Sequence, residues 1–444
     1  MEKSKNLEAV KKENVKFIHL HFIDITGALK STAIPAEHLE DVLENGRGFD
    51  GSSILGYTPI HESDMLLMPD PSTFAIIPWS SEKSARIICD IYLPGGKRFE
   101  GDPRYVAQRA AEKAREMGYI YNCGPELEFF VFRKESENAT PLMMDHGGYF
   151  DFHPLDLAED VRKEMILVLE SLGLTVEMSH HEVAPSQYEV DFKFGDLVTT
   201  ADRVITYKMV AKTIAHLHGY IATFMPKPLF GENGSGMHTH QSLWKIKKNR
   251  NVFFDPSMKR SDALSEEALY FIGGLLYHAK ALAAVVAPTV NSYKRLVPGY
   301  EAPVYISWAH KNRSALIRVP EYYPGMEKAM RAEFRCPDPA SNPYLAFACM
   351  CAAGLDGIEK KILPPEPIEA DIYEMNAKER EEKGIDSLPS TLIDALNELR
   401  KDEVLKEALG RHVYENFMKV KLNEWDEFRI HVTEWEIKKY MKYC

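Results

Sequence analysis

The 444-residue sequence predicts an α+β fold in two domains. Residues 15–100 consist mainly of strand-like runs and turns, with few helical stretches. The remainder alternates between strand-like and helix-like segments, and polar residues alternate along several of its strands. Strands joined through helices, with polar side chains at alternate positions, are typical of an α+β domain whose sheet has one functional face. We therefore place a boundary near residue 100, with domains over residues 1–100 and 101–444.

Local patterns predict the individual elements. Residues 15–23 and 85–93 are strand-like runs bounded by glycine-containing turns. Asp102 followed by Pro103 predicts a helix start, because aspartate caps helices and proline is favoured at the first helical position. That helix should end at Gly118. Further strands are predicted at residues 126–133, 148–153, 187–194 and 220–224, and helices at residues 157–172, 200–218, 265–287 and 391–409.

Composition excludes several classes of protein. A net charge of −12 argues against nonspecific binding to nucleic acid or to an anionic membrane surface. The N-terminal residues are polar and charged, unlike a secretory signal, and the longest weakly polar run, residues 279–290, is too short to cross a bilayer. The six cysteines show no framework spacing, and Cys349 and Cys351 in an apolar helix-like run predict buried thiols. These features predict a cytoplasmic protein with no nucleic-acid or membrane partner.

Residues 227–242 (KPLFGENGSGMHTHQS) are the most informative segment of the chain. They combine a proline, a glycine-rich turn and two histidines, His238 and His240. Glycines cost backbone entropy unless the chain must bend sharply or approach a ligand. Residues two apart share one face of an extended segment, so both histidines should point the same way. Taken alone, this segment fits a surface loop leading into an edge strand as well as it fits a binding site.

Several glutamates provide possible partners for His238. Glu126 and Glu128 share one face of a predicted strand, with apolar residues at the alternate positions. Any one such glutamate fits a solvated strand face, but several carboxylates converging near a core would require cations, and two divalent ions would offset most of their charge. Carboxylates with a single imidazole suit Mg²⁺ or Mn²⁺ better than zinc. The set comprises Glu126, Glu128, Glu182, Glu189 and Glu333.

Basic residues are concentrated in turn-rich or apolar surroundings later in the chain. Basic residues usually serve surface solubility, but in these surroundings recognition of carboxylate or phosphate is an equally good interpretation. Two divalent ions beside a cationic cluster would suit phosphoryl transfer, in which the cations stabilise the developing charge. The residues concerned are Arg295, Arg313, Arg318, Lys328, Arg331 and Arg335.

With these motifs the sequence resembles glutamine synthetase, type I, over essentially its full length. The resemblance rests on six motifs in the order found in that family. The length of the chain and the residues around Tyr373 resemble the shorter subtype without adenylylation control, so we predict that Tyr373 is not modified. The motifs are FDGSS at 49–53 with ESD at 62–64, GPELE at 124–128, HE at 181–182 with Glu189, residues 227–242, RLVPGYEAP at 295–303, and NR at 312–313.

The resemblance implies a specific architecture. It implies an N-terminal β-grasp domain and a C-terminal catalytic domain on a curved antiparallel sheet with surrounding helices. It also implies a dodecamer of two stacked six-membered rings, with each active site between neighbouring subunits of a ring. The loop that carries Asp50 would come from the adjacent subunit, and a C-terminal helical segment around residues 425–443 would reach the opposite ring.

The resemblance also implies roles for metal and ATP ligands. Two or more Mg²⁺ or Mn²⁺ ions per subunit are expected, and ATP is a substrate. One metal site would consist of Glu128, Glu182 and Glu189, and the other of Glu126, His238 and Glu333. ATP would contact Tyr149, Glu177, Phe194, His240, Ser242, Arg318, Lys328 and Arg331. Residues 319–327, just before Lys328, depart from the family's pattern.

Glutamate and ammonium sites follow in the same way. Asp50, with Ser53 beside it, would bind ammonium and accept its proton. Glu301 would close over the site, and Arg313 would face the transferred phosphoryl group, so that Asp50, Glu301 and Arg313 are the expected catalytic residues. Glutamate would be held by Asn233, Gly234, Arg295, Glu301, Arg313 and Arg335.

The implied activity is the ATP-dependent ligation of ammonia to L-glutamate through γ-glutamyl phosphate, which gives glutamine, ADP and phosphate in nitrogen assimilation. A γ-glutamyl ligase that uses a larger amine would keep the metals and arginines, but the intact residues 50–53 favour ammonia. A catalytically silent regulatory homologue would lose ligands, whereas every matched position here is filled. A metal-stabilised scaffold leaves the arginine clusters unexplained. Small regulatory proteins are possible partners.

Overall fold

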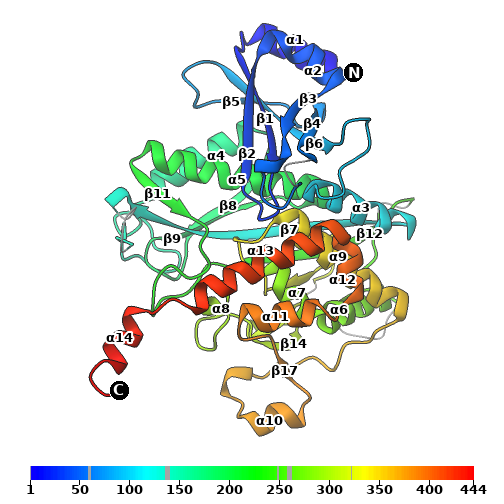
Figure 1. Ribbon diagram of the computed structural model, residues 1–444. Helices are drawn as coiled ribbons and strands as arrows, with labels where there is room; N and C mark the ends of the chain where they lie inside the picture. The colour runs from blue at the N-terminus through cyan, green and yellow to red at the C-terminus, as the bar shows by residue number, and fades with distance from the viewer. Residues whose placement is uncertain (1, 59–61, 136–140, 248–249, 258–262, 322) are drawn as a thin grey trace.

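The computed structural model describes residues 2–58, 62–135, 141–247, 250–257, 263–321 and 323–444 (Figure 1). The N-terminal part contains a six-stranded sheet in the order β2-β1-β6-β4-β3, with β5 also paired to β6. Its strands β1 and β6 are parallel, and the other pairs are antiparallel. The strands are β1 (Phe17–Ile23), β2 (Leu29–Pro35), β3 (Arg47–Asp50), β4 (Asp64–Pro69), β5 (Ala75–Ile77) and β6 (Ser84–Tyr92).

Two helices, α1 (Glu2–Lys12) and α2 (Leu39–Asn45), pack on each other, and α2 also packs on β4. Ile18, Leu20 and Ile87 lie in a core that this sheet and its helices enclose separately from the rest of the chain. The strands predicted at residues 15–23 and 85–93 are confirmed to within two residues. This part of the chain is the β-grasp domain that the family resemblance implies.

The larger sheet has eleven strands, and its main path runs β17-β14-β15-β16-β12-β7-β9-β8. The pair β14–β15 is parallel, and every other described pair is antiparallel. Strand β7 (Tyr119–Arg133) crosses the middle of the molecule in Figure 1 and begins seven residues earlier than predicted. The other strands are β8 (Val176–His181), β9 (Gln187–Phe192), β10 (Gly195–Asp196), β11 (Tyr220–Thr223), β12 (Met237–Lys245), β13 (Arg250–Asn251), β14 (Tyr305–Ala309), β15 (Ala315–Arg318), β16 (Ala332–Phe334) and β17 (Asp386–Ser387).

Helix α9 (Pro343–Lys360) is central to the helical part and contacts α3, α5, α6, α7 and α12. Cys349 and Cys351 lie on it and are buried, as predicted. Helix α3 (Pro103–Glu116) starts as predicted, because the Asp102 carboxylate accepts a hydrogen bond from the Arg104 backbone N–H. The remaining helices are α4 (Glu159–Ser171), α5 (Leu197–Leu217), α6 (Glu266–Tyr277), α7 (Ala279–Val286), α8 (Ser292–Arg295), α10 (Ala377–Glu382), α11 (Leu392–Leu399), α12 (Glu403–Leu409), α13 (Arg411–Arg429) and α14 (Glu434–Tyr440).

Three predicted elements differ from the structure. Residues 148–153 form a turn and not a strand, because the Asp151 carboxylate accepts a hydrogen bond from the Gly148 N–H over 2.9 Å. The helix predicted at residues 265–287 is two helices bent by 73° at His278, whose ring lies between the carboxylates of Asp356 and Asp402. The helix predicted at residues 391–409 is also broken, where Asp402 caps α12.

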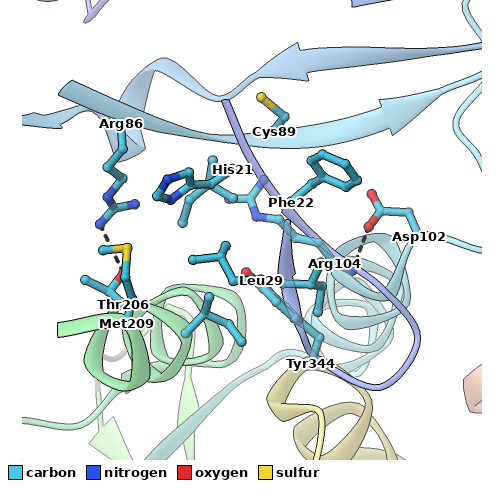
Figure 2. Close-up of a pocket in the computed structure, with 13 residues that line it drawn as sticks. His21, Phe22, Leu29, Arg86, Cys89, Asp102, Arg104, Thr206, Met209 and Tyr344 are labelled. Atoms are coloured by element: carbon cyan, nitrogen blue, oxygen red, sulfur yellow. Dashed lines mark hydrogen bonds between the residues drawn. The ribbon is translucent and has the colours of Figure 1, made fainter. Parts of the chain in front are cut away.

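Buried charges connect the two parts of the molecule. Arg104 donates hydrogen bonds to Asp202 of α5 and to Asp70 and Asp90 of the N-terminal part, over 2.6–3.0 Å. A cavity of about 10 Å³ lies beside this network, between β1 and β6 on one side and α5 and α9 on the other (Figure 2). His21 and Arg86 face this cavity. The hydrogen bonds of Arg104 therefore hold the N-terminal domain against helix α5.

Among the described residues, no single helix has both the length and the composition to span a membrane. The consecutive helices α6 and α7 have that length and composition only when taken together, and they are bent by 73° relative to each other. Most of their apolar residues are buried inside the fold, where the two helices pack against α9 and α11.

Candidate active site

The candidate site lies where four neighbouring strands, β16, β12, β7 and β9, bring acidic and imidazole side chains together. Strand register explains the arrangement: β12 pairs His238 with Glu126 of β7, and β9 pairs Glu189 with Glu128 of β7. The alternate residues of β7, such as Leu127, are buried in the hydrophobic core. The predicted alternation of β7, with carboxylates on one face and apolar residues on the other, is therefore confirmed.

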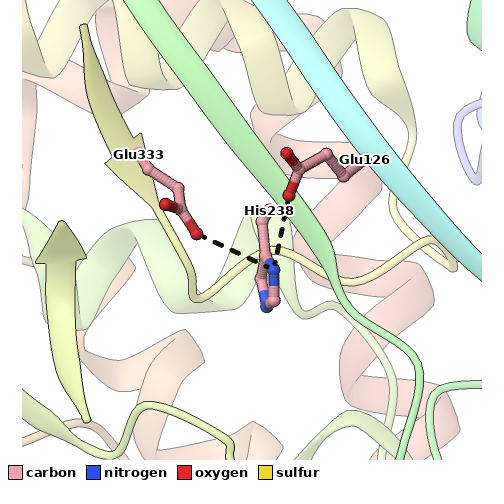
Figure 3. Close-up of side chains that lie close together, drawn as sticks. All are labelled: Glu126, His238 and Glu333. Atoms are coloured by element: carbon pink, nitrogen blue, oxygen red, sulfur yellow. Dashed lines mark ion pairs between the residues drawn. The ribbon is translucent and has the colours of Figure 1, made fainter. Parts of the chain in front are cut away.

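Glu126, His238 and Glu333 form the first cluster (Figure 3). Nδ1 of His238 lies 3.8 Å from Oε2 of Glu126 and 3.9 Å from Oε1 of Glu333. These separations are too long for direct hydrogen bonds. One ligand atom from each residue lies within 4.8 Å of the others, so the three side chains surround a common point.

The surroundings of this first cluster keep its groups in the forms that bind metal. Burial raises the pKa of Glu333, but Arg335, which donates a 2.6 Å hydrogen bond to it, brings that pKa down to about 2. Burial, reinforced by the charge of Arg335, lowers the pKa of His238 to about 4. Glu333 is therefore a carboxylate and His238 a neutral imidazole at neutral pH, and these are the forms that coordinate metals.

A second cluster contains His180, Glu182 and Glu189, again with ligand atoms within 4.8 Å of one another. Nε2 of His180 lies 2.8 Å from Oε1 of Glu182. Sequence reasoning missed His180, although it lies two residues before Glu182 and so points to the same face of the chain. The third residue predicted for this metal site, Glu128, lies outside the cluster.

The carboxylates around the second cluster have too little positive charge nearby to offset their mutual repulsion. Burial and then the nearby Glu182 raise the pKa of Glu128 to about 8. Burial and then Asp191 raise the pKa of Glu189 well above its usual range. Nδ1 of His180 and Oδ1 of Asp191 are buried and, within the described chain, make no hydrogen bond. A hard divalent cation such as Mg²⁺ or Mn²⁺ would relieve the repulsion and supply a partner, so the donor set fits the expected metals.

A cavity of about 350 Å³ opens beside the first cluster. Six of the eight residues predicted to contact ATP line it: Glu177, Phe194, His240, Ser242, Lys328 and Arg331. The sequence did not identify Asn122, Met178 or Asp191, which also line this cavity. An aromatic side chain and cationic groups therefore line one cavity next to a carboxylate cluster. This arrangement suits a nucleotide with its phosphates.

Tyr149 and Arg318 do not line this cavity. The Tyr149 ring lies 5.4 Å from that of His180 in an edge-on arrangement. Burial and then the charge of Glu182 raise the Tyr149 pKa, while Arg313 opposes them. Arg318 instead donates a 2.8 Å hydrogen bond to Oε2 of Glu333.

A smaller cavity, of about 40 Å³, borders both clusters, through His238 and Glu182, and is lined by five of the six residues predicted for glutamate. Glycine is required in its wall, because a Cβ at Gly234 would lie 2.4 Å from the carbonyl oxygen of Pro226. Arg313 does not line this cavity. The five predicted residues that do are Asn233, Gly234, Arg295, Glu301 and Arg335, and Gln187 and Tyr300 join them without having been predicted.

Asp50 and Ser53 lie in the N-terminal domain and line neither cavity. The Asp50 carboxylate is exposed and accepts hydrogen bonds from the Ser52 N–H over 2.8 Å and from its hydroxyl over 2.7 Å. These bonds lower the pKa of Asp50. A single chain thus brings together most of the predicted metal and substrate residues, whereas Tyr149, Arg313 and Arg318, like the predicted ammonium residues, line neither cavity.

Comparison with known proteins identifies the family. The model of the glutamine synthetase catalytic domain matches residues 100–440, and that of the glutamine synthetase β-grasp domain matches residues 14–94. The chain is 55% identical to a glutamine synthetase of Methanosarcina mazei over 438 residues, which cover 98% of this chain and 96% of the relative. It is 53% identical to a glutamine synthetase of Thermotoga maritima over 435 residues, which cover 97% and 98%.

A solved structure described as a GmaS/ADP complex also matches the fold. Its TM-score is 0.89 at 33% sequence identity, and the match covers 99% of each chain. The sequence matches extend over both domains, and the structural match extends over the same length. The chain belongs to the glutamine synthetase family.

Proposed function

We propose that this protein is a glutamate–ammonia ligase, which uses ATP to join ammonia to L-glutamate through γ-glutamyl phosphate. One observation carries the proposal: the first carboxylate cluster borders both a large cavity, through Glu126, and a small one, through His238, and the second cluster borders the small cavity through Glu182. The large cavity suits a nucleotide, and the small one suits an amino acid. The γ-phosphate of ATP and the side chain of glutamate would then meet at the clusters, where phosphoryl transfer requires positive charge.

Mg²⁺ or Mn²⁺, two or more per subunit, would be held by the two clusters and would neutralise phosphate oxygens when bound. Glu126, His238 and Glu333 form one set of ligands. Glu182, Glu189 and His180 would form the other. Glu128, which the family resemblance assigns to the same site, is paired with Glu189 on the neighbouring strand.

Basic side chains of the chain itself would bind and orient the reactants. Lys328, Arg331 and His240 line the large cavity and would surround the phosphates, while Arg313 would face the transferred phosphoryl group. Arg295 and Arg335 line the small cavity and would hold the carboxylates of glutamate. Glu301, also on the small cavity, would close it and keep water away from the acyl phosphate.

Asp50 and Ser53 would act in the active site of a neighbouring subunit. The lowered pKa of Asp50 keeps its carboxylate ionised, as a group that binds ammonium and accepts its proton must be. This role requires the ring assembly that the family resemblance implies, a dodecamer of two hexamers. Helix α14 supports that assembly, because it projects from the body in Figure 1 and none of its residues is buried in a single chain.

The proposal includes a cytoplasmic location, where ATP is supplied, and leaves open small regulatory proteins as partners. It also includes the absence of adenylylation at Tyr373. The Tyr373 hydroxyl donates a 2.5 Å hydrogen bond to the carbonyl oxygen of Ala302, next to Glu301, and burial raises its pKa to about 12. A hydroxyl bonded in this way is a poor nucleophile for modification. An AMP adduct at Tyr373 detected by mass spectrometry would contradict this part of the proposal.

Phosphate release from ATP tests the activity directly. The assay contains Mg²⁺ and glutamate, with or without ammonium, and the amino-acid product is identified. Ammonium-dependent release with one glutamine formed per phosphate supports the proposal. Release that needs an organic amine would identify the ligase with a larger amine, and no release under any condition would support the silent homologue.

A further inference from the structure

Gln187 is a buried amide at the boundary between the two clusters and the small cavity. It is the first residue of β9, and only 1% of its surface is exposed. Its backbone closes the turn after Glu182, since its N–H donates to the Ala184 carbonyl and its carbonyl accepts from the Glu182 N–H. Its side chain lines the small cavity together with Glu128 and Gly234.

The side-chain amide of Gln187 connects three separate segments. Its Nε2 donates to Oε2 of Glu128 over 2.9 Å, to the Gly234 carbonyl over 3.1 Å and to the Ser235 hydroxyl over 3.2 Å. Its Oε1 accepts from the Ala184 N–H over 3.2 Å. The Ala184 contact fixes the orientation of the amide, because a flipped amide would place its oxygen against a carboxylate and a carbonyl.

These contacts determine which Glu128 oxygen remains available. Oε2 of Glu128 accepts hydrogen bonds from Gln187 and, over 3.0 Å, from the Gly236 N–H. Within the part of the chain that the structure describes, no hydrogen bond reaches Oε1. One oxygen is therefore held by protein donors, and the other is free to bind a cation.

We propose that Gln187 is a positioning residue that fixes the Glu128 carboxylate and the Gly234 carbonyl relative to each other. Because Glu128 is a proposed metal ligand and Gly234 a proposed glutamate contact, one amide places both groups. Hydrogen-bonded partners of metal ligands tune metal affinity in this way. The inference rests on the proposed function, in that it assigns Glu128 and Gly234 to the metal and glutamate sites.

The test compares two substitutions that separate hydrogen bonding from packing. Gln187→Met keeps the length of the side chain and removes the amide, whereas Gln187→Asn keeps an amide that is one methylene too short. Gln108→Met is the matched control, because Gln108 also donates an amide N–H to a carboxylate, that of Asp90 over 3.1 Å, but lies outside the site. Mn²⁺ affinity is measured by titration of the assembled protein, and KM is measured for glutamate and for ATP.

For Gln187→Met we expect roughly tenfold weaker Mn²⁺ binding and a KM for glutamate raised about as much, with the KM for ATP nearly unchanged. Gln187→Asn should show losses no larger than those of Gln187→Met. Wild-type behaviour of Gln187→Met beside an impaired Gln187→Asn would show that only packing matters and would overturn the inference. So would a fall in kcat alone, without change in Mn²⁺ affinity or in the KM for glutamate.

Failure of the proposed function gives a different result. If the wild-type protein forms no glutamine, the assigned reaction is wrong, whatever Gln187 does. Mn²⁺ titration of wild type and Gln187→Met still tests the link to Glu128 in that case. If the wild-type protein does form glutamine and Gln187→Met binds Mn²⁺ as tightly as wild type, only the inference about Gln187 is overturned.

Discussion

Arg331 donates a hydrogen bond from its Nε to Nδ1 of His240 over 3.1 Å. Since Nδ1 of His240 accepts this bond, the proton of the neutral ring lies on Nε2, which donates to Oε1 of Glu126 over 2.7 Å. An arginine that lines the large cavity is thus connected, through one imidazole, to a carboxylate of the first cluster. This hydrogen bond holds Arg331 beside the first cluster, although residues 319–327, just before Lys328, depart from the family's pattern.

Arg331→Lys should therefore weaken ATP binding selectively. Lysine has no Nε donor in the position that reaches His240, and it lacks the planar fork that binds phosphate oxygens. We expect a KM for ATP raised roughly tenfold, which corresponds to about 1.4 kcal/mol, with the KM for glutamate little changed. Steady-state kinetics with each substrate varied in turn measures both. Arg400→Lys, at an exposed arginine on the far helices, is the control and should behave as wild type.

Glu333→Gln should remove one metal site and leave the other. The variant keeps the shape of the side chain but loses the charge beside His238 and the partner of Arg335 and Arg318. We expect one fewer tightly bound Mn²⁺ per subunit and a loss of at least about 100-fold in kcat. Counting bound Mn²⁺ by electron paramagnetic resonance checks the first effect. Glu403→Gln, at an exposed glutamate, should bind as many ions as wild type.

The sequence predicted the placement of the strand carboxylates better than it predicted the loops around them. Alternation along β7 was sufficient to place Glu126 and Glu128 on one face, because that pattern is local. His180 and Gln187 were missed, because their roles depend on the register of β8 and β9 and on which donors lie across the turn. The bend at His278 was missed for a related reason, since two carboxylates from distant helices hold the ring. The role proposed for Asp50 depends on a second chain, which no pattern within one chain specifies.

Arg104→Met should destabilise the contact between the domains. The substitution leaves the carboxylates of Asp70, Asp90 and Asp202 without their shared cation, and Arg104 itself is only 4% exposed. Breaking a buried ion pair on one side costs about 3–5 kcal/mol. Thermal unfolding followed by circular dichroism should show a clear fall in the midpoint. Adding Asp202→Asn should recover part of the loss, whereas purely additive losses would show that unpaired charge is not the cause.

His21 should make the protein less stable as the pH falls below neutrality. Burial, helped by the nearby Arg86 and His19, lowers the pKa of His21 to about 3, while the unfolded chain has the ordinary value of 6.5. Below pH 6.5 His21 therefore binds a proton in the unfolded state but not in the folded state. The free energy of unfolding is highest above that pH and decreases as the pH falls towards 3. At pH 5 the loss amounts to about 2 kcal/mol per subunit.

The measurement for His21 compares wild type with His21→Leu at pH 7.5 and pH 5. Asp102, which lines the same cavity, has a pKa that burial raises to about 6 and contributes in the opposite direction. Because both proteins contain Asp102, its contribution cancels in the comparison. The unfolding midpoint of His21→Leu should fall less between the two pH values than that of wild type. Equal falls in both proteins would show that His21 is not the titrating group.

Subunit mixing should show that Asp50 acts in the site of a neighbouring chain. Asp50→Ala and His238→Asn should each be inactive when assembled alone, because each removes one part of every site. Coexpressed with two different tags and purified through both, a mixed ring contains some sites in which an intact Asp50 meets an intact His238 from the next subunit. Random assembly predicts about a quarter of the wild-type activity. If Asp50 and His238 served the same site from one chain, every site would lack one of them, and the mixed assembly would stay inactive.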